Sequence, residues 1–364
     1  MSIQRNTHRC LYLFALIGLA FALIACGETT TEVTPTVGSA TLAASEARAL
    51  PEQETSTPEP TIAPTETLVP TTAPTDTPEP TATPTDTPEP QSLYLGDIVE
   101  QDGYLLSAVT VEDPTTPGMF YEPESGKKLV AAQVIVGNVS GETLDVNPLY
   151  ATMVDGEGFV YQPELAGRDG QIITVGLGPG EKAEGWIAFE IPEEATAASI
   201  KYATEVFGDS FLQASLAPRP EGSVADTEAL SVAPPAPETR LGEVLEQDGL
   251  SLAASVVEDP TTPGMLYEPK EGYRLVAVEI VVGNISSETL SVNPLSAYLV
   301  DNSGFVYQVE LGGRDGQIAT TDLGAGEKAR GWVAYSIPED AIPASIKYST
   351  EVFSDKFLEV GLTQ

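Results

Sequence analysis

Histidine and cysteine are almost absent from this sequence. The 364 residues contain one histidine, His8, and two cysteines, Cys10 and Cys26, all within the first 26 positions. If that segment is processed, the remaining chain has no imidazole and at most one thiol, at its own N-terminus. This excludes Ser-His-Asp and Cys-His catalysis, His or Cys zinc sites, haem ligation and disulfides within the chain. We therefore expect a protein that is not an enzyme and has no cofactor.

Positive charge is also scarce. The chain carries 17 Lys and Arg residues against 54 Asp and Glu residues, which gives a formal net charge of -37. Binding to phosphate groups requires a field of the opposite sign. Nucleic acid is therefore excluded as a partner.

The N-terminus has the features of an export signal. Arg5 and Arg9 precede an uninterrupted apolar run, Leu11 to Ala25, which is shorter than the roughly 20 residues of a membrane span. The run ends in Leu-Ile-Ala-Cys-Gly, the pattern of a bacterial lipobox. We predict a signal peptide over residues 1–25, cleavage between Ala25 and Cys26, and a diacylglyceryl group on the Cys26 thiol. The alternative is an uncleaved signal anchor with an incidental cysteine.

This anchor predicts the location of the protein. Two acyl chains hold a protein stably on a membrane, so we expect it on the extracytoplasmic face of the bacterial cell membrane, exposed at the cell surface. Residues 26–92 are rich in Thr, Pro and Glu, with near-repeats of Pro-Thr-Asp-Thr-Pro-Glu-Pro. Such a composition has too little apolar surface to form a core, so we predict a disordered stalk.

The rest of the chain contains the same domain twice. Residues 95–216 align without a gap onto residues 241–362 at an offset of 146, and about two-thirds of the paired positions are identical. We predict domains over residues 93–216 and 241–364. A Pro/Ala-rich linker over residues 217–240 separates them, and its composition predicts two independent domains, like beads on a string.

Each copy shows alternating apolar residues with turn signals every 8 to 12 residues. Residues 129–136 read as a core strand ended by Gly137-Asn138, and residues 149–154 and 159–161 flank a glycine-containing hairpin turn. Residues 182–191 form a further strand. The pattern predicts an all-β fold of two immunoglobulin-like antiparallel β-sandwiches. Because the antibody-type cysteine pair is missing, we expect Trp186, Trp332 and aliphatic residues to form the cores.

These motifs resemble a known family. The runs Gly126 to Asn138, Leu144 to Leu149, Val154 to Gln162, Gly180 to Ala188 and Ile191 to Ala195 each recur 146 residues later. Together they resemble the immunoglobulin-fold domain of unknown function found in many bacterial lipoproteins, which is grouped with telokin-like and mycobacterial secreted-antigen domains. The resemblance implies an extracytoplasmic antiparallel sandwich, and it implies no reaction and no catalytic residue.

Several loops contain candidate binding residues. The acidic pairs Glu112-Asp113 and Glu258-Asp259, with Asp155 and Glu157 in the hairpin turn, offer oxygen ligands of the kind calcium prefers, although no stretch matches a calcium-binding loop. Solvated turns are the alternative, and calcium stays only a weak possibility. The repeated Gly-Arg-Asp-Gly segments place Arg168, Asp169, Arg314 and Asp315 in possible recognition loops, or in simple Arg-Asp pairs within a turn. Tyr121 and Tyr267, after Pro-Gly-Met, are possible exposed anchors.

Taken together, these features predict a non-catalytic, lipid-anchored surface protein. It would display two immunoglobulin-like domains for binding or adhesion to an unknown envelope or extracellular ligand, as a monomer. The alternative is a structural spacer of the envelope with no ligand. A remote alternative is a glycan-active enzyme that uses carboxylates such as Glu164 or Asp169. A Ser-Lys dyad is disfavoured, because Lys182 and Lys201 lie on predicted strands where they would face water.

Overall fold

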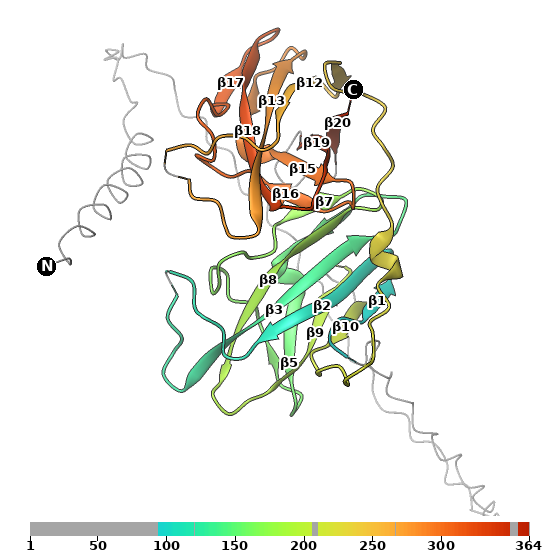
Figure 1. Ribbon diagram of the computed structural model, residues 1–364, viewed down its shortest axis with the longest axis vertical. Coiled ribbons are helices and arrows are strands. Elements are labelled where there is room, and N and C mark those ends of the chain that lie inside the picture. Colours follow the sequence, from blue (N-terminus) through green and yellow to red (C-terminus); the bar gives the residue numbers. More distant parts are fainter. Residues whose placement is uncertain (1–93, 120, 206–209, 266, 350–355, 364) are drawn as a thin grey trace, which may run out of the picture. The chain divides into compact units, whose positions relative to one another are not determined.

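The computed structural model of the protein describes residues 94–119, 121–205, 210–265, 267–349 and 356–363. Both copies of the repeat fall within one compact unit, Pro80–Gln364. Each copy is a β-sandwich, which confirms the predicted fold class, and Figure 1 shows copy 1 in blue to green and copy 2 in orange to red.

The described part of copy 1 contains ten strands and one short 3-10 helix. They are β1 (Ile98–Gln101), β2 (Tyr104–Glu112), β3 (Lys127–Asn138), β4 (Leu144–Val146), η1 (Pro148–Tyr150), β5 (Ala151–Asp155), β6 (Val160–Tyr161), β7 (Val175–Leu177), β8 (Lys182–Pro192), β9 (Ala197–Ala203) and β10 (Phe211–Ser215).

Copy 2 repeats this order. Its elements are β11 (Leu245–Gln247), β12 (Leu250–Glu258), β13 (Tyr273–Asn284), β14 (Leu290–Val292), η3 (Pro294–Ser296), β15 (Ala297–Asp301), β16 (Val306–Gln308), β17 (Thr321–Leu323), β18 (Lys328–Pro338), β19 (Pro343–Ser349) and β20 (Phe357–Gly361). The linker between the copies forms the short 3-10 helix η2 (Glu228–Ser231).

The sheets have the same topology in both copies, and every pair of neighbouring strands is antiparallel. In copy 1 the first sheet has the order β1-β2-β3-β8 and the second β10-β9-β5-β6, while β4 and β7 form a two-stranded sheet. In copy 2 the corresponding orders are β11-β12-β13-β18, β16-β15-β19-β20 and β14-β17. The predicted core strand and hairpin are therefore present, as β3 and as β5 with β6.

The main core of copy 1 lies between its two four-stranded sheets. Val130, Ala132, Val134 and Val136 alternate along β3 and point into it, as the two-residue period of a strand requires. The intervening residues face the other side, where Leu129 and Ala131 pack with Ala188 into a second, smaller cluster. Strand β3 is buried on both faces, which explains its nearly continuous apolar sequence.

The prediction that the tryptophans form the main cores is wrong. Trp186 and Trp332 are only partly buried, and they pack against the small clusters on the outer faces of the first sheets. Gly185, next to Trp186, lies on the core-facing side of β8, where a Cβ atom would lie 2.4 Å from Cα of Ile172, a residue of the main core. Gly331 has the same relation to Ile318, at 2.5 Å.

The two sandwiches are not independent domains. Val300 and Val306 of copy 2 are part of the buried apolar cluster of copy 1, and Lys182 in β8 donates its backbone N–H to the carbonyl of Gly304 at 2.8 Å. The linker also packs on copy 1, where Arg219 pairs with Asp97. The prediction of beads on a string is therefore wrong, because the copies share a buried contact surface.

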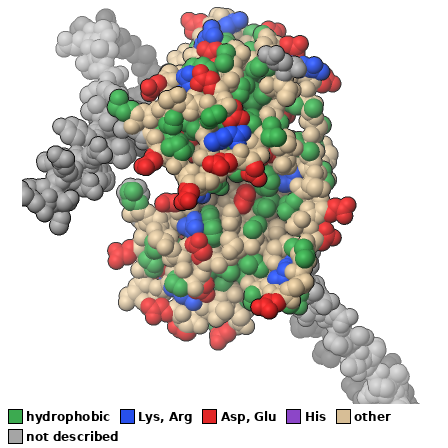
Figure 2. All heavy atoms as spheres, in the orientation of Figure 1, with side chains coloured by type: hydrophobic (Ala, Val, Ile, Leu, Met, Phe, Trp, Pro, Cys, Tyr) green, Lys and Arg blue, Asp and Glu red, His purple; other side chains and the backbone are tan. Residues whose placement is uncertain are grey.

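Acidic side chains are spread over the surface. Figure 2 shows Asp and Glu residues scattered across the visible face of both sandwiches, with few Lys and Arg residues among them. A dispersed negative charge of this kind repels anions over the whole molecule without marking one site.

Candidate binding sites

A stacked arginine fastens two loops over the outer face of the first sheet in each copy. In copy 1, Arg168 donates from Nε and Nη2 to the two carboxylate oxygens of Glu112, at 3.0 and 2.8 Å. Its Nε also lies 3.1 Å from the hydroxyl of Thr115. The guanidinium carbon lies 3.6 Å from the ring centroid of Trp186, which is the geometry of a cation–π contact.

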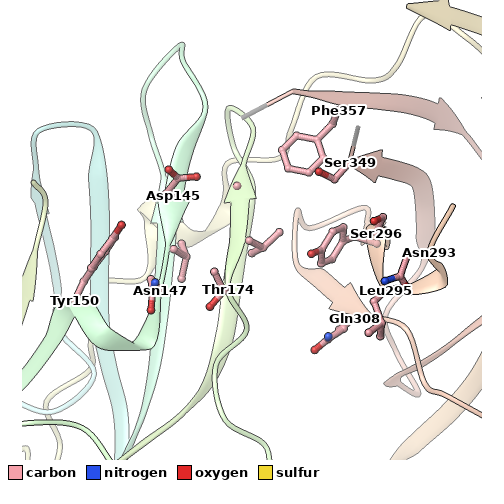
Figure 3. Close-up of a pocket in the computed structure, with 14 residues that line it drawn as sticks. Asp145, Asn147, Tyr150, Thr174, Asn293, Leu295, Ser296, Gln308, Ser349 and Phe357 are labelled. Atoms are coloured by element: carbon pink, nitrogen blue, oxygen red, sulfur yellow. The ribbon is translucent and has the colours of Figure 1, made fainter. Parts of the chain in front are cut away.

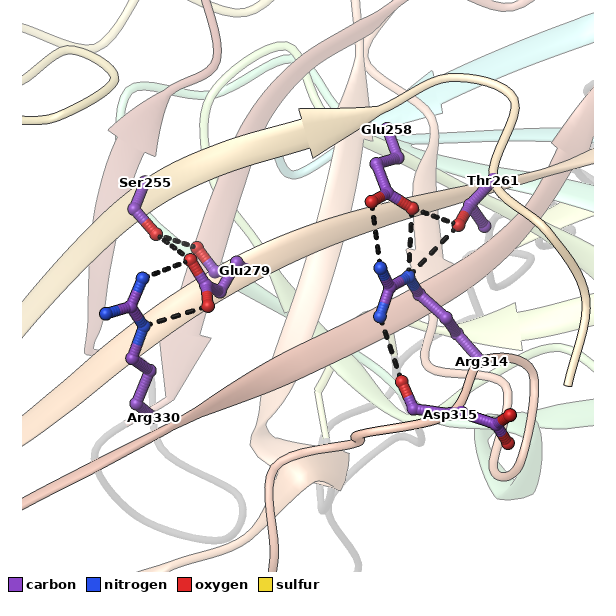
Figure 4. Close-up of polar contacts among 7 residues, drawn as sticks. All are labelled: Ser255, Glu258, Thr261, Glu279, Arg314, Asp315 and Arg330. Carbon is purple, nitrogen blue, oxygen red and sulfur yellow. Dashed lines mark hydrogen bonds and ion pairs between the residues drawn. The ribbon is translucent and has the colours of Figure 1, made fainter.

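Copy 2 repeats this cluster with nearly the same distances. Arg314 donates to both oxygens of Glu258, at 3.0 and 2.8 Å, and to the Thr261 hydroxyl at 3.1 Å (Figure 4). Its guanidinium carbon lies 3.5 Å from the Trp332 ring centroid. The neighbouring sheet surface differs between the copies, because Glu279 binds Arg330 in copy 2 where copy 1 pairs Gln133 with Glu184.

The structure therefore joins residues that the sequence placed in separate loops. Arg168 and Arg314 pair with Glu112 and Glu258, and they reach only the backbone carbonyls of Asp169 and Asp315, at 2.9 Å. The prediction of an Arg-Asp ion pair within the turn is wrong. The hydrogen bonds from arginine, with those from threonine, lower the pKa of each glutamate.

The remaining predicted loop residues divide into paired and exposed groups. Asp113 pairs with Lys128 at 2.7 Å, and Asp259 pairs with Arg274 at 2.6 Å. The side chains of Asp169 and Asp315 are exposed. Ligand binding by these loop residues stays a prediction.

Tyr121 and Tyr267 are partly buried and pack on the small outer clusters, so neither is a fully exposed anchor. The hydroxyl of Tyr121 donates to Glu190 at 2.8 Å, and burial together with this bond raises the pKa of the phenol. The exposed apolar residues of these loops are instead Met119 and Met265, with 85% and 93% of their surface accessible.

The acidic hairpin turns are stabilised by internal hydrogen bonds. Asp155 accepts from the backbone amides of Glu157 and Phe159 and from the Tyr161 hydroxyl, at 3.0, 2.9 and 2.8 Å. Burial alone would raise the pKa of Asp155, yet these donors lower it. Asp301 makes the same contacts in copy 2. Among the described residues, no group of three or more His, Cys, Asp or Glu side chains is placed to hold a metal ion.

A cleft lies between the two copies. This cleft of about 470 Å³ has one wall from copy 1 and one from copy 2, and Figure 3 shows side chains from both walls around it. Its lining combines aromatic rings with amide, hydroxyl and carboxylate groups. The residues that give it this character are Asp145, Asn147, Tyr150, Thr174, Asn293, Ser296, Tyr298, Gln308, Ser349 and Phe357.

Equivalent turns from the two copies line this cleft. Asn147 caps η1 by accepting a hydrogen bond from the amide of Leu149 at 2.9 Å, and Asn293 caps η3 through Leu295 at 3.0 Å. The Asn-Pro-Leu sequence explains both turns, since asparagine caps a helix start and proline fits the first turn. Phe357 forms an edge contact with Tyr298, with ring centroids 6.4 Å apart.

Buried charges hold the two walls together. Lys347 of copy 2 forms an ion pair with Glu181 of copy 1 and donates to the carbonyl of Gly176 at 2.8 Å. Lys182 donates to the carbonyls of Ser303 and Val232, at 2.7 and 2.6 Å. Lys182 is 2% exposed, so the prediction that it faces water is wrong, and burial lowers its pKa.

Sequence reasoning missed the cleft and the ion pair that supports it. Glu181 and Lys347 have identical counterparts in the other copy, Glu327 and Lys201, so the identity of the two charged residues does not show that Glu181 and Lys347 are the ones that pair. The available signals were differences between the copies, such as Tyr298, an aromatic residue where copy 1 has Thr152.

The predicted anchor lies outside the described residues. Ala25, Cys26 and the stalk belong to the first 93 positions, so the cleavage site and lipidation stay predictions. Within the described part of the chain, no helix is long and apolar enough to cross a membrane.

Comparison with known proteins links both copies to one family. The profile of a domain of unknown function, DUF4352, matches residues 95–212 and 239–360. No curated protein matches the chain.

Similar solved structures include three proteins from two bacterial species. The YjhA protein of Bacillus subtilis has 16% identity and a TM-score of 0.28, over 34% of this chain and 99% of that one. A putative lipoprotein of B. subtilis, YcdA, has 14% identity and a TM-score of 0.29, over 37% and 41%. The secreted protein MPT63 of Mycobacterium tuberculosis has 16% identity and a TM-score of 0.27, over 34% and 95%.

Proposed function

We propose that this chain, which belongs to the family defined by the domain of unknown function DUF4352, is a non-catalytic binding protein of the bacterial cell surface. In this proposal a diacylglyceryl group on Cys26 anchors the protein to the extracytoplasmic face of the membrane. The ligand occupies the cleft between the two copies, and it is a neutral polar molecule such as a glycan.

The observation that carries the proposal is the cleft with walls from both copies. Its volume of about 470 Å³ lies in the range of roughly 300–1,000 Å³ that ligand sites of proteins occupy. The aromatic rings of Tyr150, Tyr298 and Phe357 offer flat apolar surface, while Gln308 and Thr174 offer neutral hydrogen-bonding groups. This combination suits a sugar, which has apolar ring faces and many hydroxyls.

The charge of the protein restricts the ligand further. With a net charge of -37, the chain repels anions, so phosphorylated or strongly acidic polymers are disfavoured. Neutral oligosaccharides do not suffer this repulsion. The negative charge of the protein therefore favours uncharged envelope or extracellular glycans over anionic ones.

The proposal is tested by binding of labelled protein to an array of neutral oligosaccharides, followed by titration of each glycan that binds. Thr174 is exposed and lines the cleft, so Thr174→Arg should fill the site without disturbing a core and weaken binding at least tenfold. Thr320, the equivalent exposed residue of copy 2, does not line the cleft, which makes Thr320→Arg the matched control.

Two outcomes would contradict the proposal. Equal weakening by both variants would place the ligand elsewhere on the molecule. The absence of any saturable glycan would favour the alternative role, a structural spacer of the envelope.

A further inference from the structure

The contact between the two copies joins two different surfaces. Copy 1 contributes a turn face, residues 176–182. Copy 2 contributes a sheet face, the outward side of its β16-β15-β19-β20 sheet together with the hairpin turn at residues 303–305. Such a contact is heterologous, because neither copy uses the same surface as its neighbour.

Both faces contain side chains that are almost completely buried. Glu181 and Lys182 of the turn face are each 2% exposed, and Lys347 of the sheet face is 1% exposed. On the same sheet face Val300 is fully buried and Val306 is 6% exposed. The turn face and the sheet face thus form a closely packed junction around a buried ion pair.

Copy 1 carries its own sheet face, and that face is open. Phe159 and Val160, the counterparts of Phe305 and Val306, are 62% and 55% exposed. Lys201 lies 4.5 Å from the ring centroid of Phe211, just as Lys347 lies 4.4 Å from that of Phe357. Lys201 and the ring of Phe211 are therefore already arranged as Lys347 and Phe357 are in the internal junction.

Copy 2 likewise carries its own turn face, and that face is open too. Glu327 and Lys328, the counterparts of Glu181 and Lys182, are exposed. Glu327 accepts a hydrogen bond from the amide of Gly324 at 2.6 Å, the same bond that Glu181 forms with Gly178 at 2.6 Å. A shallow hollow of about 460 Å³ lies at this position, lined in part by Thr321, Asp322, Glu327 and Lys328.

We propose that the chain associates head to tail with a second copy of itself, through the open sheet face of copy 1 in one molecule and the open turn face of copy 2 in the next. Lys201 and Glu327 pair across this junction, as Lys347 and Glu181 pair within the chain. Because the contact is heterologous, each added molecule leaves one open face of each kind.

Differences between the copies make this junction weaker than the internal one. The open sheet face has Thr152 in place of Tyr298, which removes an aromatic ring. The open turn face has Asp322 in place of Gly176, and a Cβ atom at Gly176 would lie 2.9 Å from the ring of Phe357. Asp322 also brings a second carboxylate towards the lysine, so the pairing of charges is retained.

Sedimentation velocity of the chain from Gly27 onwards, which lacks only the predicted leader and lipidated cysteine, tests the proposal. The sedimentation coefficient should rise with protein concentration. Lys201→Glu and Glu327→Lys should each weaken association at least tenfold, because each places like charges at the junction. Glu246→Lys, at an exposed position of β11, is the charge-matched control and should associate as the unaltered chain does.

Mixing the two charge-reversal variants provides the decisive measurement. In the mixture every junction between the two different variants pairs opposite charges, either the natural pair or the reversed pair, so association should return. A sedimentation coefficient that does not change with concentration would overturn the proposal. So would variants that associate as the unaltered chain does, or a mixture that stays dissociated although each variant keeps the melting temperature of the original.

Discussion

At the scale of single residues, the arginine clusters explain why two loops of each copy are held in place. Arg168 lies between the carboxylate of Glu112 and the ring of Trp186, and Arg314 repeats this arrangement in copy 2. The sequence predicted these charged residues as features of interest but assigned them to loops by position alone. Their pairing depends on residues 56 positions apart, which only the tertiary fold brings together.

Acid should weaken these clusters. The pKa values of Glu112 and Glu258 are lowered in the folded state from 4.5, so their stabilising effect is complete above about pH 4.5 and is lost as the pH falls through the lowered values. The double variant Glu112→Gln, Glu258→Gln should lose less stability than the original chain between about pH 6 and pH 3, by up to about 1 kcal/mol per copy.

The pH dependence of stability can be followed through the two tryptophans of the chain, since each stacks against one of these arginines. Tryptophan fluorescence during urea unfolding at each pH gives the free energy of unfolding. Glu122→Gln, at an exposed position of the same loop, is the control. An identical pH dependence in the double variant and the original chain would refute the assignment.

A second prediction at this scale concerns Tyr335. The ring is fully buried, and within the described residues its hydroxyl has no hydrogen-bond partner. Copy 1 has Phe189 at the equivalent position. Tyr335→Phe should therefore raise the free energy of unfolding by about 1–2 kcal/mol, and Phe189→Tyr should lower it by a similar amount. A loss of stability in Tyr335→Phe, measured by urea unfolding, would indicate that the hydroxyl is satisfied.

At the scale of elements, sequence pattern predicted several of the strands, because their alternation of apolar residues reflects burial. Strand β3 and the β5–β6 hairpin follow directly from apolar spacing and from turn glycines. The place of Trp186 could not be predicted in the same way. Both faces of β8 are partly buried, so alternation does not tell which face meets the main core and which meets the small outer cluster.

The same limit applies to the cleft. Its walls are assembled from turns of both copies, and each turn is readable from Asn-Pro-Leu alone, but the contact between the walls is not. Because about two-thirds of the paired positions are identical, the two copies offer many of the same candidate contacts. Which pair is used depends on small differences such as Tyr298 against Thr152.

Lysine substitutions distinguish β19, whose Lys347 pairs with Glu181 of copy 1, from its counterpart β9, whose Lys201 lies on the open sheet face. Lys347→Met keeps the length of the side chain but either leaves Glu181 unpaired or separates the copies, and the free energy of unfolding should fall by about 3 kcal/mol or more. Lys201→Met, on the open face, should change it by less than about 1 kcal/mol. Urea unfolding of both variants checks this difference, and equal effects would contradict the buried pairing.

At the scale of the whole molecule, the protein is predicted to combine a lipid anchor, a stalk and a docked pair of sandwiches. The family and the all-β fold followed from sequence motifs that recur at a constant offset. The docking did not, since the Pro-rich linker indicated independent domains. Its residues instead pack on copy 1, where the carbonyl of Val232 accepts a hydrogen bond from Lys182.

The anchor is tested by Cys26→Ser. The substitution removes the thiol that receives the lipid, so the protein should no longer be labelled by a radioactive fatty acid, and its leader should stay attached. Labelling and leader cleavage are read from gels of membrane and soluble fractions, with Cys10→Ser as the matched control. Fatty-acid labelling that persists in Cys26→Ser would contradict the predicted site.

The central claim is that the two copies form one docked unit with a cleft between them. Residual dipolar couplings measured by NMR on the chain from Gly27 onwards test this claim most directly. The account predicts that backbone couplings from β3 and β13, and from all other strands, fit a single alignment tensor. Two alignment tensors of different magnitude or orientation, one for each copy, would show that the copies reorient independently and would contradict the account.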